Sequence, residues 1–325
     1  MTRRVGLQVV ILGLCAMAAP SLAQAQSLRY PEKSVTMISD AGAGASVDVG
    51  TRIIAESLGK LWGQTATVVN HPGANGSIAA RAASEATSDG YTLYTPASST
   101  FVALPTVAPN LPVKLPRDFL PIGFLADQPL FLAVNPASGI TSVRDLVNRA
   151  KKEPGTISVA VSGVGRMTHL TSIMLQQQAG ITLIPVPYTG GPSAALADVF
   201  SGRVAMIIEG YAGIIGSVTA GQVKLIATTA AHRLSEFRDL PTVAETIPGV
   251  AASGWFMIAA PVGTPAPIIA KVSADVTKVV NDPEIKKRLA AIGSYTNAMT
   301  PQETEAFVAK EQETWLPVLQ RVSKQ

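Results

Sequence analysis

Short apolar runs alternate with stretches of helical periodicity along most of the chain. Residues 35–38, 66–69 and 91–94 are rich in β-branched and apolar side chains, which is typical of buried strands. Between them, residues 48–61 and 77–86 repeat apolar positions every three or four residues, and this spacing predicts helices. Alternation of this kind predicts right-handed βαβ units around a parallel sheet.

The same alternation resumes in the second half of the chain. The predicted strands there are 157–161, 183–186, 204–208 and 224–228, and the predicted helices are about 167–179 and 193–200. Two separate sets of βαβ units predict two α/β lobes.

Two extended stretches are predicted to connect the lobes. Residues 118–136 contain the apolar runs FLPIGFLA and PLFLAVNP without helical spacing, and residues 253–261 (SGWFMIAAP) form the matching return. Pro267, Pro283 and Pro301 each fit the first turn of a C-terminal helix. We therefore expect an α/β protein with a ligand cleft between its lobes. The expected boundaries are 26–126 with about 250–325 for the first lobe, and about 127–249 for the second.

The N-terminus has the pattern of an export signal. Arg3 and Arg4 precede an apolar stretch from Val5 to Ala19, and Ala23-Gln24-Ala25 fits the A-x-A cleavage pattern. The apolar stretch is shorter than a membrane span requires, which disfavours an uncleaved anchor. We predict a signal peptide over residues 1–25, cleavage after Ala25, and an exported mature protein.

Charge and cysteine content exclude several classes of protein. The formal net charge is +4, and two of these charges belong to the predicted signal peptide. No Lys/Arg-rich block occurs, so we expect no nucleic-acid partner. The single cysteine, Cys15, also lies in the signal peptide, so the mature chain has neither a disulfide nor thiolate chemistry. With 15% charged and 47% hydrophobic residues, the chain is expected to bury a large core.

Two glycine loops raise the question of a nucleotide cofactor. Gly42-Ala43-Gly44 follows the first strand, but Val47 occupies the third glycine position of the dinucleotide fingerprint. Gly163-Val164-Gly165 fails in the same way, with Thr168 at that position. No phosphate-binding G-x-x-x-x-G-K-S/T motif is present. We predict no cofactor.

Signatures of catalysis and metal binding are missing as well. There is no G-x-S-x-G nucleophile elbow, and His71, His169 and His232 have no zinc-type spacing. A role for His169 as a partner of nearby backbone is favoured over a catalytic one. We predict no metal ligands, no catalytic residues and no enzymatic activity.

Each glycine loop leads into the N-terminus of a predicted helix. Free N–H groups and the positive end of the helix dipole make such a loop an anion site that needs no catalytic side chain. Ligands of open α/β sheets lie at the carboxyl ends of the strands. Two facing lobes would thus hold a small organic acid from both sides. The alternative is that the glycines serve only the tight turns of the fold.

Stretches spread over the chain match one known family. They are YPEKSVTMI, the loop with Asp48 and Arg52, VVNHPGANGSIAA, SDGYTL, LPRDFLPIG, AVNP, VSGVGRMTHL, VPYTGGPSAALADVFSGRV, DLPTVAET and PVGTPAP. The chain resembles the solute-binding proteins of tripartite tricarboxylate transporters, also called Bug-type receptors. The resemblance implies the type II periplasmic-binding-protein fold. It also implies binding of carboxylates through backbone amides and bridging waters, and delivery to a membrane permease.

The resemblance also implies a set of ligand-binding residues. The first loop supplies Gly44, Ala45, Ser46, Val47 and Asp48. The second supplies Ser162, Gly163, Val164, Gly165 and Arg166, with His169 close behind. Supporting positions are Ser98, Ser99, Tyr188, Thr189, Gly190 and Glu209.

The chain departs from the family pattern at four of its positions. Asp40-Ala41 stands where the family usually has Pro-Phe, so Ala41 leaves room for a bulkier ligand, and Ala45 stands where the family has a second glycine. Arg166 replaces a small residue at the start of a helix, where a positive charge opposes the dipole and requires a partner. That partner is either an acid on the surface or a ligand carboxylate in a planar two-point contact. Asp48 is interpreted as a first-turn acid, with an ammonium contact as the alternative.

We therefore expect a monomeric periplasmic receptor that captures a small carboxylate and passes it to permease subunits. A dicarboxylate, an aromatic one included, is favoured over an amino acid or a monocarboxylate. Two alternatives stay open from the sequence: a receptor that presents its ligand to a signalling sensor, and a secreted hydrolase with a triad in the cleft.

Overall fold

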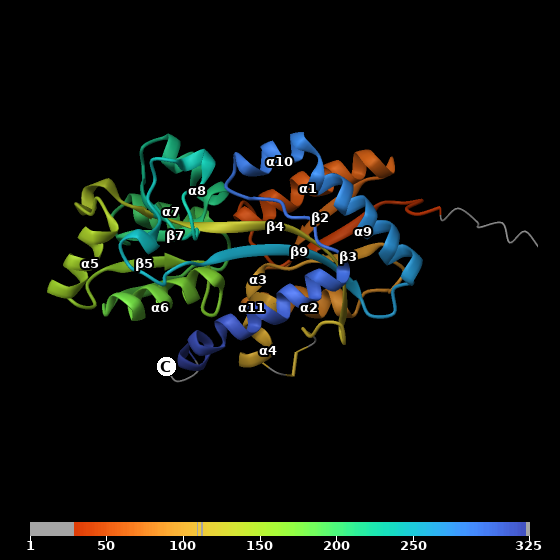
Figure 1. Cartoon of the computed structure of the whole chain (residues 1–325), viewed down its shortest axis with the longest axis horizontal. Coiled ribbons are helices and arrows are strands. Elements are labelled where there is room, and N and C mark those ends of the chain that lie inside the picture. The colour runs from red at the N-terminus through yellow and green to blue at the C-terminus, as the bar shows by residue number, and fades with distance from the viewer. Residues whose placement is uncertain (1–28, 109, 112, 323–325) are drawn as a thin grey trace, which may run out of the picture.

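The computed structural model describes residues 29–322 except residues 109 and 112. The predicted signal peptide, residues 1–25, lies outside the described residues. The chain forms two α/β lobes that lie side by side along the long axis of the molecule (Figure 1).

The first lobe is built on three parallel strands. Strand β1 pairs with β2 on one side and with β3 on the other. The strands are β1 (Val35–Ser39), β2 (Ala66–Asn70) and β3 (Thr92–Thr95), and the helices among them are α1 (Ser46–Trp62), α2 (Ser77–Ser84), α3 (Ser98–Val102) and α4 (Leu104–Val107). The predicted βαβ units of this lobe are confirmed, with strand ends within one residue of the expected positions.

The second lobe repeats the arrangement. Strand β5 pairs in parallel with β6 and with β7. Its strands are β5 (Ser158–Val161), β6 (Ile184–Pro187), β7 (Met206–Gly210) and β8 (Lys224–Thr228), and its helices are α5 (Val143–Lys152), α6 (Met167–Ala179), α7 (Pro192–Phe200) and α8 (Tyr211–Thr219). Single 3₁₀ turns lie at Ala74–Gly76, Pro136–Ser138, Ser235–Phe237 and Val243–Glu245.

Two long strands connect the lobes, as the sequence predicted. Strand β4 (Phe119–Val134) pairs antiparallel with β9 (Ser253–Pro261) through its first part, and with β7 and β8 through its last part. The strand order is β2-β1-β3-β9-β4-β7-β5-β6, with β8 also paired to β4. A single sheet therefore runs through both lobes (Figure 1).

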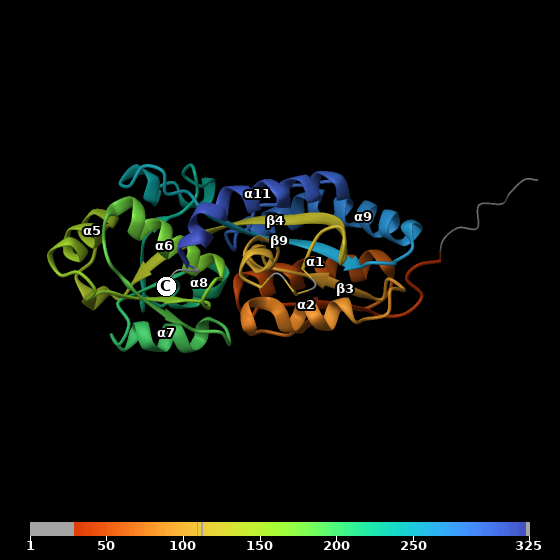
Figure 2. The same cartoon turned by 90° about the horizontal axis from the view of Figure 1, so that it is seen from below.

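Helices cover both faces of the sheet in the first lobe. C-terminal to β9 come α9 (Ala266–Asn281), α10 (Pro283–Ala290) and α11 (Pro301–Val322). Helices α1, α9 and α10 lie on one side, and α2, α3, α4 and α11 lie on the other (Figures 1 and 2). Phe307 of α11 packs edge-on against Phe124 of β4 and Trp255 of β9, so this helix is fixed to both crossing strands. The predicted large core is thus present on both faces.

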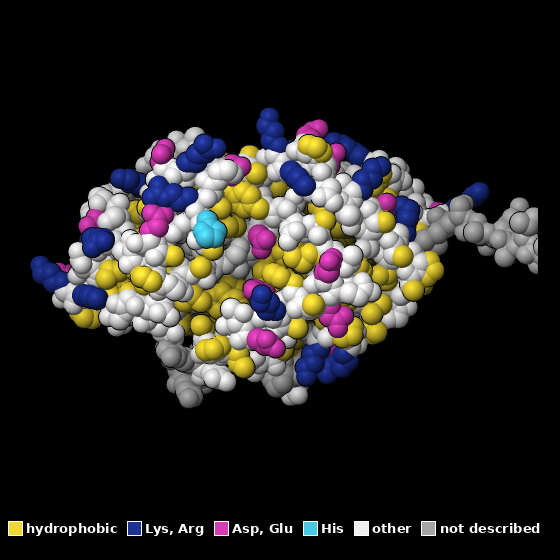
Figure 3. All heavy atoms as spheres, in the orientation of Figure 1, with side chains coloured by type: hydrophobic (Ala, Val, Ile, Leu, Met, Phe, Trp, Pro, Cys, Tyr) yellow, Lys and Arg dark blue, Asp and Glu magenta, His cyan; other side chains and the backbone are white. Residues whose placement is uncertain are grey.

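Charged side chains of both signs are mixed on the surface. On the face shown in Figure 3, Lys and Arg side chains are scattered among acidic ones and form no continuous basic patch. Across residues 29–322, apart from 109 and 112, none of the helices combines the length and the apolar character that crossing a bilayer requires.

Candidate ligand-binding cleft

A cleft lies between the lobes at the carboxyl ends of β1, β3, β5 and β7, where ligands of open α/β sheets bind. Ten of the residues predicted to bind ligand line it: Ala45, Ser46, Val47, Ser98, Ser99, Ser162, Arg166, Tyr188, Thr189 and Glu209. The lining also includes Asp40, Ala41, Gly42, Gly73, Asn75, Gly76, Ala97, Gln128, Leu130, Met167, Thr168, Gly191, Gly254 and Trp255.

The first loop brings the N-terminus of a long helix to the cleft. Ala45 is the N-cap of α1 in extended conformation, and Ser46 and Val47 begin the helix. None of these three side chains caps the helix, although the hydroxyl of Ser46 accepts a hydrogen bond from Gly213 N of the second lobe at 3.0 Å. The first-turn amides and the helix dipole therefore favour an anion here.

The two lobes touch through glycines beside this loop. A Cβ atom on Gly42 would lie 2.7 Å from the backbone nitrogen of Gly191, closer than side chains approach backbone. The absence of a side chain at Gly42 thus allows the first lobe to contact the second.

The second loop brings the N-terminus of α6 to the cleft from the other lobe. Gly163 and Gly165 have φ values of 142° and 78°, which side chains rarely adopt, and they turn the chain into the helix. Gly165 N donates to Nδ1 of His169 at 3.1 Å, and burial lowers the pKa of that imidazole below its ordinary value. His169 is thus an acceptor for the loop backbone, whereas the sequence favoured a hydrogen bond to a carbonyl or packing under the loop.

Seven predicted ligand residues lie outside the cleft lining: Gly44, Asp48, Gly163, Val164, Gly165, His169 and Gly190. Asp48 illustrates the reason. Its carboxylate accepts hydrogen bonds from Gly44 N at 2.9 Å and Asn70 Nδ2 at 2.8 Å, and forms an ion pair with Arg52 at 2.9 Å. Asp48 thus shapes the first loop, and Val164 points outward with 53% of its surface exposed.

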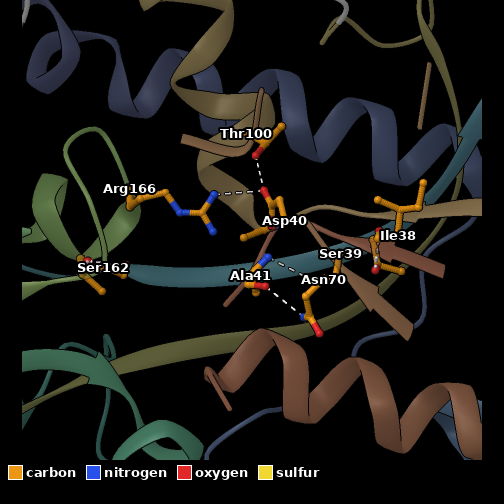
Figure 4. Close-up of polar contacts among 11 residues, drawn as sticks. Ile38, Ser39, Asp40, Ala41, Asn70, Thr100, Ser162 and Arg166 are labelled. Carbon is orange, nitrogen blue, oxygen red and sulfur yellow. Dashed lines mark hydrogen bonds and ion pairs between the residues drawn. The ribbon is translucent and has the colours of Figure 1, made fainter. Parts of the chain in front are cut away.

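Arg166 forms an ion pair with Asp40 across the cleft. Its Nη1 lies 3.0 Å from Oδ2 of Asp40, and the exposed fractions of the two side chains are 12% and 0% (Figure 4). Burial alone would lower the pKa of Arg166, but the charge of Asp40 and the hydrogen bond outweigh it and raise the pKa. The expectation of a surface acid as partner is wrong, because the acid is buried and belongs to the other lobe.

Asp40 is held in turn by its own lobe. Ala97 N donates to Oδ1 at 2.9 Å, and the hydroxyl of Thr100 donates to Oδ2. One terminal nitrogen of Arg166 points at Asp40, and the other is turned away from it (Figure 4). In the described part of the chain, neither Nε nor Nη2 of Arg166 has a hydrogen-bond partner or an ion pair.

Glu209 is the other acid of the cleft, at the end of β7. It is 8% exposed, and its Oε1 accepts a hydrogen bond from Gly210 N at 2.9 Å. Burial raises the pKa of Glu209 to about 7, although the Gly210 N–H and the charge of Arg166 act in the opposite direction. Its carboxyl is thus close to half ionised at neutral pH.

Sequence reasoning missed the floor of the cleft. Gln128 and Leu130 of β4 and Gly254 and Trp255 of β9 line it. These residues lie in apolar runs whose pattern indicates only core. The available signal was topological, because strands that cross between two lobes must pass below a cleft that separates them.

The chain's affiliation follows from its sequence and fold together. A sequence model described as the tripartite tricarboxylate transporter family receptor matches residues 51–323. The chain belongs to this family. It is 31% identical to the protein BugT of Bordetella pertussis over 322 residues, which cover 98% of this chain and 97% of BugT.

Solved structures agree with this family. The periplasmic binding protein BugD has a TM-score of 0.83 and 28% identity, covering 90% of this chain and 99% of its own. An R. palustris protein solved with adipate has a TM-score of 0.86 and 28% identity, covering 90% and 98%. MatC from Rhodopseudomonas palustris, with bound malate, has a TM-score of 0.81 and 25% identity, covering 89% and 100%.

These comparisons confirm the predicted family and the two-lobe periplasmic-binding-protein fold. The family and its structural neighbours are solute-binding proteins, so this receptor of a tricarboxylate-type transport system is not an enzyme and the hydrolase alternative is set aside. Among the described residues, no group of His, Cys, Asp and Glu side chains is arranged to hold a metal ion.

Proposed function

We propose that this receptor captures a small carboxylate between its lobes and delivers it to the membrane permease of a tripartite tricarboxylate transporter. The observation that carries the proposal is the convergence of two long helices on one cleft, α1 from the first lobe and α6 from the second. Each presents N-terminal amides to an anion. Neighbours solved with adipate and malate support a carboxylate ligand.

The ligand is proposed to be a dicarboxylate, with aromatic dicarboxylates included. Asp40 occupies one terminal nitrogen of Arg166, which leaves Nη2 and Nε as an edge for a planar two-point contact with a carboxylate. The second carboxylate would meet the amides at Ser46 and Val47. Ala41 lines the cleft with only a methyl group, which leaves space for a ring.

Calorimetry on matched ligands tests this assignment. The variant Arg166→Lys keeps the positive charge beside Asp40 but loses the planar fork. It should bind succinate 10- to 100-fold more weakly, equivalent to about 1.4–2.8 kcal/mol, because its ammonium cannot make the two-point contact. Butyrate, of the same chain length with one carboxylate, should lose less than threefold. Equal losses for the two acids would show that Arg166 does not bind the second carboxylate.

The cellular part of the proposal is export, a monomeric state and delivery. Mass spectrometry of the mature protein should find Gln26 at its N-terminus, and light scattering should give the mass of one chain. Deleting the receptor should abolish uptake of a labelled dicarboxylate by cells that keep the permease. Unchanged uptake, with the ligand still bound by the purified receptor, would favour presentation to a signalling sensor instead.

A further inference from the structure

The two lobes are bonded to each other directly across the cleft. Nη1 of Arg166 in the second lobe lies 3.0 Å from Oδ2 of Asp40 in the first. Gly213 N of the second lobe donates a hydrogen bond to Ser46 Oγ of the first at 3.0 Å. Both contacts join groups of the protein alone, so the chain itself stabilises the closed arrangement of its lobes.

The surfaces of the lobes also fit closely around these bonds. A Cβ atom on Gly191 of the second lobe would lie 2.7 Å from the carbonyl oxygen of Ala43 in the first. A Cβ atom on Gly165 of the second lobe would lie 3.2 Å from Nδ2 of Asn75 in the first. The lobes are therefore in van der Waals contact where they meet.

Asp40 is held in place by its own lobe. Ala97 N donates to Oδ1 at 2.9 Å, and the hydroxyl of Thr100 donates to Oδ2. Neither hydrogen bond involves the second lobe, so both persist when the lobes separate. The carboxylate is thus a preorganised acceptor, and little conformational entropy is lost when its partner arrives.

The guanidinium of Arg166 depends on the other lobe instead. Arg166 is the N-cap residue of α6, where a positive charge opposes the helix dipole. Among the residues that the structure describes, Asp40 provides the ion pair and the hydrogen bond of this guanidinium. Opening the lobes would break that pair, and closing them supplies the counter-ion that the charge at this helix end requires.

We propose that Asp40 and Arg166 form a latch, an ion pair between the lobes that holds the cleft closed before a ligand arrives. Asp40 acts as a carboxylate built into the first lobe, and it draws the N-terminus of α6 toward that lobe as the carboxylate of a ligand would. The inference concerns the equilibrium between open and closed lobes. It therefore goes beyond the proposed function and does not depend on which acid the receptor binds.

The latch changes the way in which a ligand enters. A latched receptor admits its ligand only during brief openings, so binding draws on a minor open state that exists beforehand. The ion pair occupies only Nη1 of Arg166, and the latch can therefore re-form after the ligand has entered.

Distances between two spin labels, measured by pulsed electron paramagnetic resonance, test the latch. The predicted mature chain, residues 26–325, has no cysteine, so the substitutions Glu85→Cys and Ala197→Cys provide the two labelling positions. Both positions are exposed, one directly after α2 and the other on α7. These helices lie below the crossing strands β4 and β9 in the view of Figure 2, so opening of the lobes separates the labels. Unfolding in urea and refolding remove any acid carried through purification.

The labelled receptor with no other substitution should show the short distance of the closed lobes without ligand, and saturating succinate should leave that distance unchanged. Adding Asp40→Asn together with Arg166→Met removes both charges and should raise the ratio of open to closed molecules at least about tenfold. The matched control is Glu56→Gln with Lys60→Met, which removes an exposed ion pair inside α1 and should leave the distances unchanged. Circular dichroism verifies that each variant is folded.

Asp40→Asn alone provides a second test that does not depend on folding of the double variant. It leaves the guanidinium of Arg166 without a counter-ion in the closed form, and this charge is better hydrated when the lobes open. The open population should therefore increase in this variant as well.

Two results would overturn the latch. One is a ligand-free receptor whose labels lie far apart until succinate is added, and the other is a set of Asp40 variants with the distances of the unsubstituted receptor. In both cases the receptor still binds carboxylates, so the proposed function stands. Conversely, a receptor that binds no dicarboxylate but shows the short distance without ligand would contradict the proposed ligand class and leave the latch intact.

Discussion

Replacing Arg166 by methionine should destabilise the protein, and a second substitution at Asp40 should then restore part of the lost stability. Met has a side chain of similar length without charge, so Arg166→Met leaves the Asp40 carboxyl without its counter-ion in a site where its exposure is 0%. Ala97 N and the Thr100 hydroxyl remain as its donors, but no positive charge is left beside it.

The magnitude follows from the geometry. Two unit charges 3.0 Å apart attract by roughly 5 kcal/mol at an effective dielectric constant of about 20. Desolvation of both groups opposes this attraction, so the net value of the pair is small, whereas removing one partner alone costs about 3–5 kcal/mol. We expect Arg166→Met to lower the free energy of unfolding by about 3 kcal/mol. Adding Asp40→Asn removes the buried charge and keeps Oδ1 as the acceptor for Ala97 N, while the amide nitrogen can donate to the Thr100 hydroxyl in place of the present hydrogen bond. This change should recover at least about 1.5 kcal/mol.

Urea denaturation of the ligand-free wild type, both single variants and the double variant measures the coupling. Arg117→Met is the matched control, because Arg117 forms an ion pair with Asp118 while 57% exposed, and its loss should change the free energy of unfolding far less. The reasoning is refuted if Asp40→Asn destabilises the Arg166→Met protein further, or if the two single losses add within about 0.5 kcal/mol.

Three further substitutions test other features of the structure. The raised pKa of Glu209 means that ionisation of its carboxyl destabilises the fold, by an amount on the order of 3 kcal/mol between the ordinary pKa of 4.5 and about 7. The melting temperature of the wild type relative to that of Glu209→Gln should therefore fall as the pH rises through this window. A constant difference between the two melting temperatures would contradict the assignment. Gly42→Ala should hold the lobes apart, because the new Cβ meets Gly191 N at 2.7 Å. This variant should bind ligand at least tenfold more weakly than the wild type and have a larger radius of gyration with ligand. Gly216→Ala, with no atom within 4 Å of the new Cβ, should change neither the affinity nor the radius of gyration. Asp48→Ala should lower the free energy of unfolding by about 1–3 kcal/mol in urea titrations, since it removes the acceptor for Gly44 N and Asn70 Nδ2. An unchanged urea midpoint would mean that the first glycine loop does not depend on this side chain.

The sequence predicts the secondary structure where the local signal is strong. The strands of both lobes and the crossings β4 and β9 lie close to their predicted positions, because apolar β-branched runs bounded by glycine and proline have few alternatives. Helix α8 was missed because it follows β7 without a loop. Gly213 and Gly216 also lower its helix propensity, so packing against α1, α7 and β7 rather than local preference forms this helix.

Local and long-range features of the site differ in how far the sequence predicts them. A glycine loop before a helix is a local pattern, so the position of both glycine loops at helix N-termini could be predicted. The Asp40–Arg166 pair joins residues 126 positions apart and exists only because the lobes meet. The raised pKa of Glu209 was equally hidden, since it results from burial in the folded cleft.

The path of the chain through the sheet has a consequence for biogenesis. In the strand order, β9 lies between β3 and β4, so the sheet of the first lobe stays open between two early strands until residue 261 has been made. Such long-range pairing folds slowly. A chain that emerges from the ribosome therefore lacks strand β9 of the first lobe for most of its synthesis. The topology delays compaction until nearly the whole chain is available, and this delay suits the export proposed for this receptor.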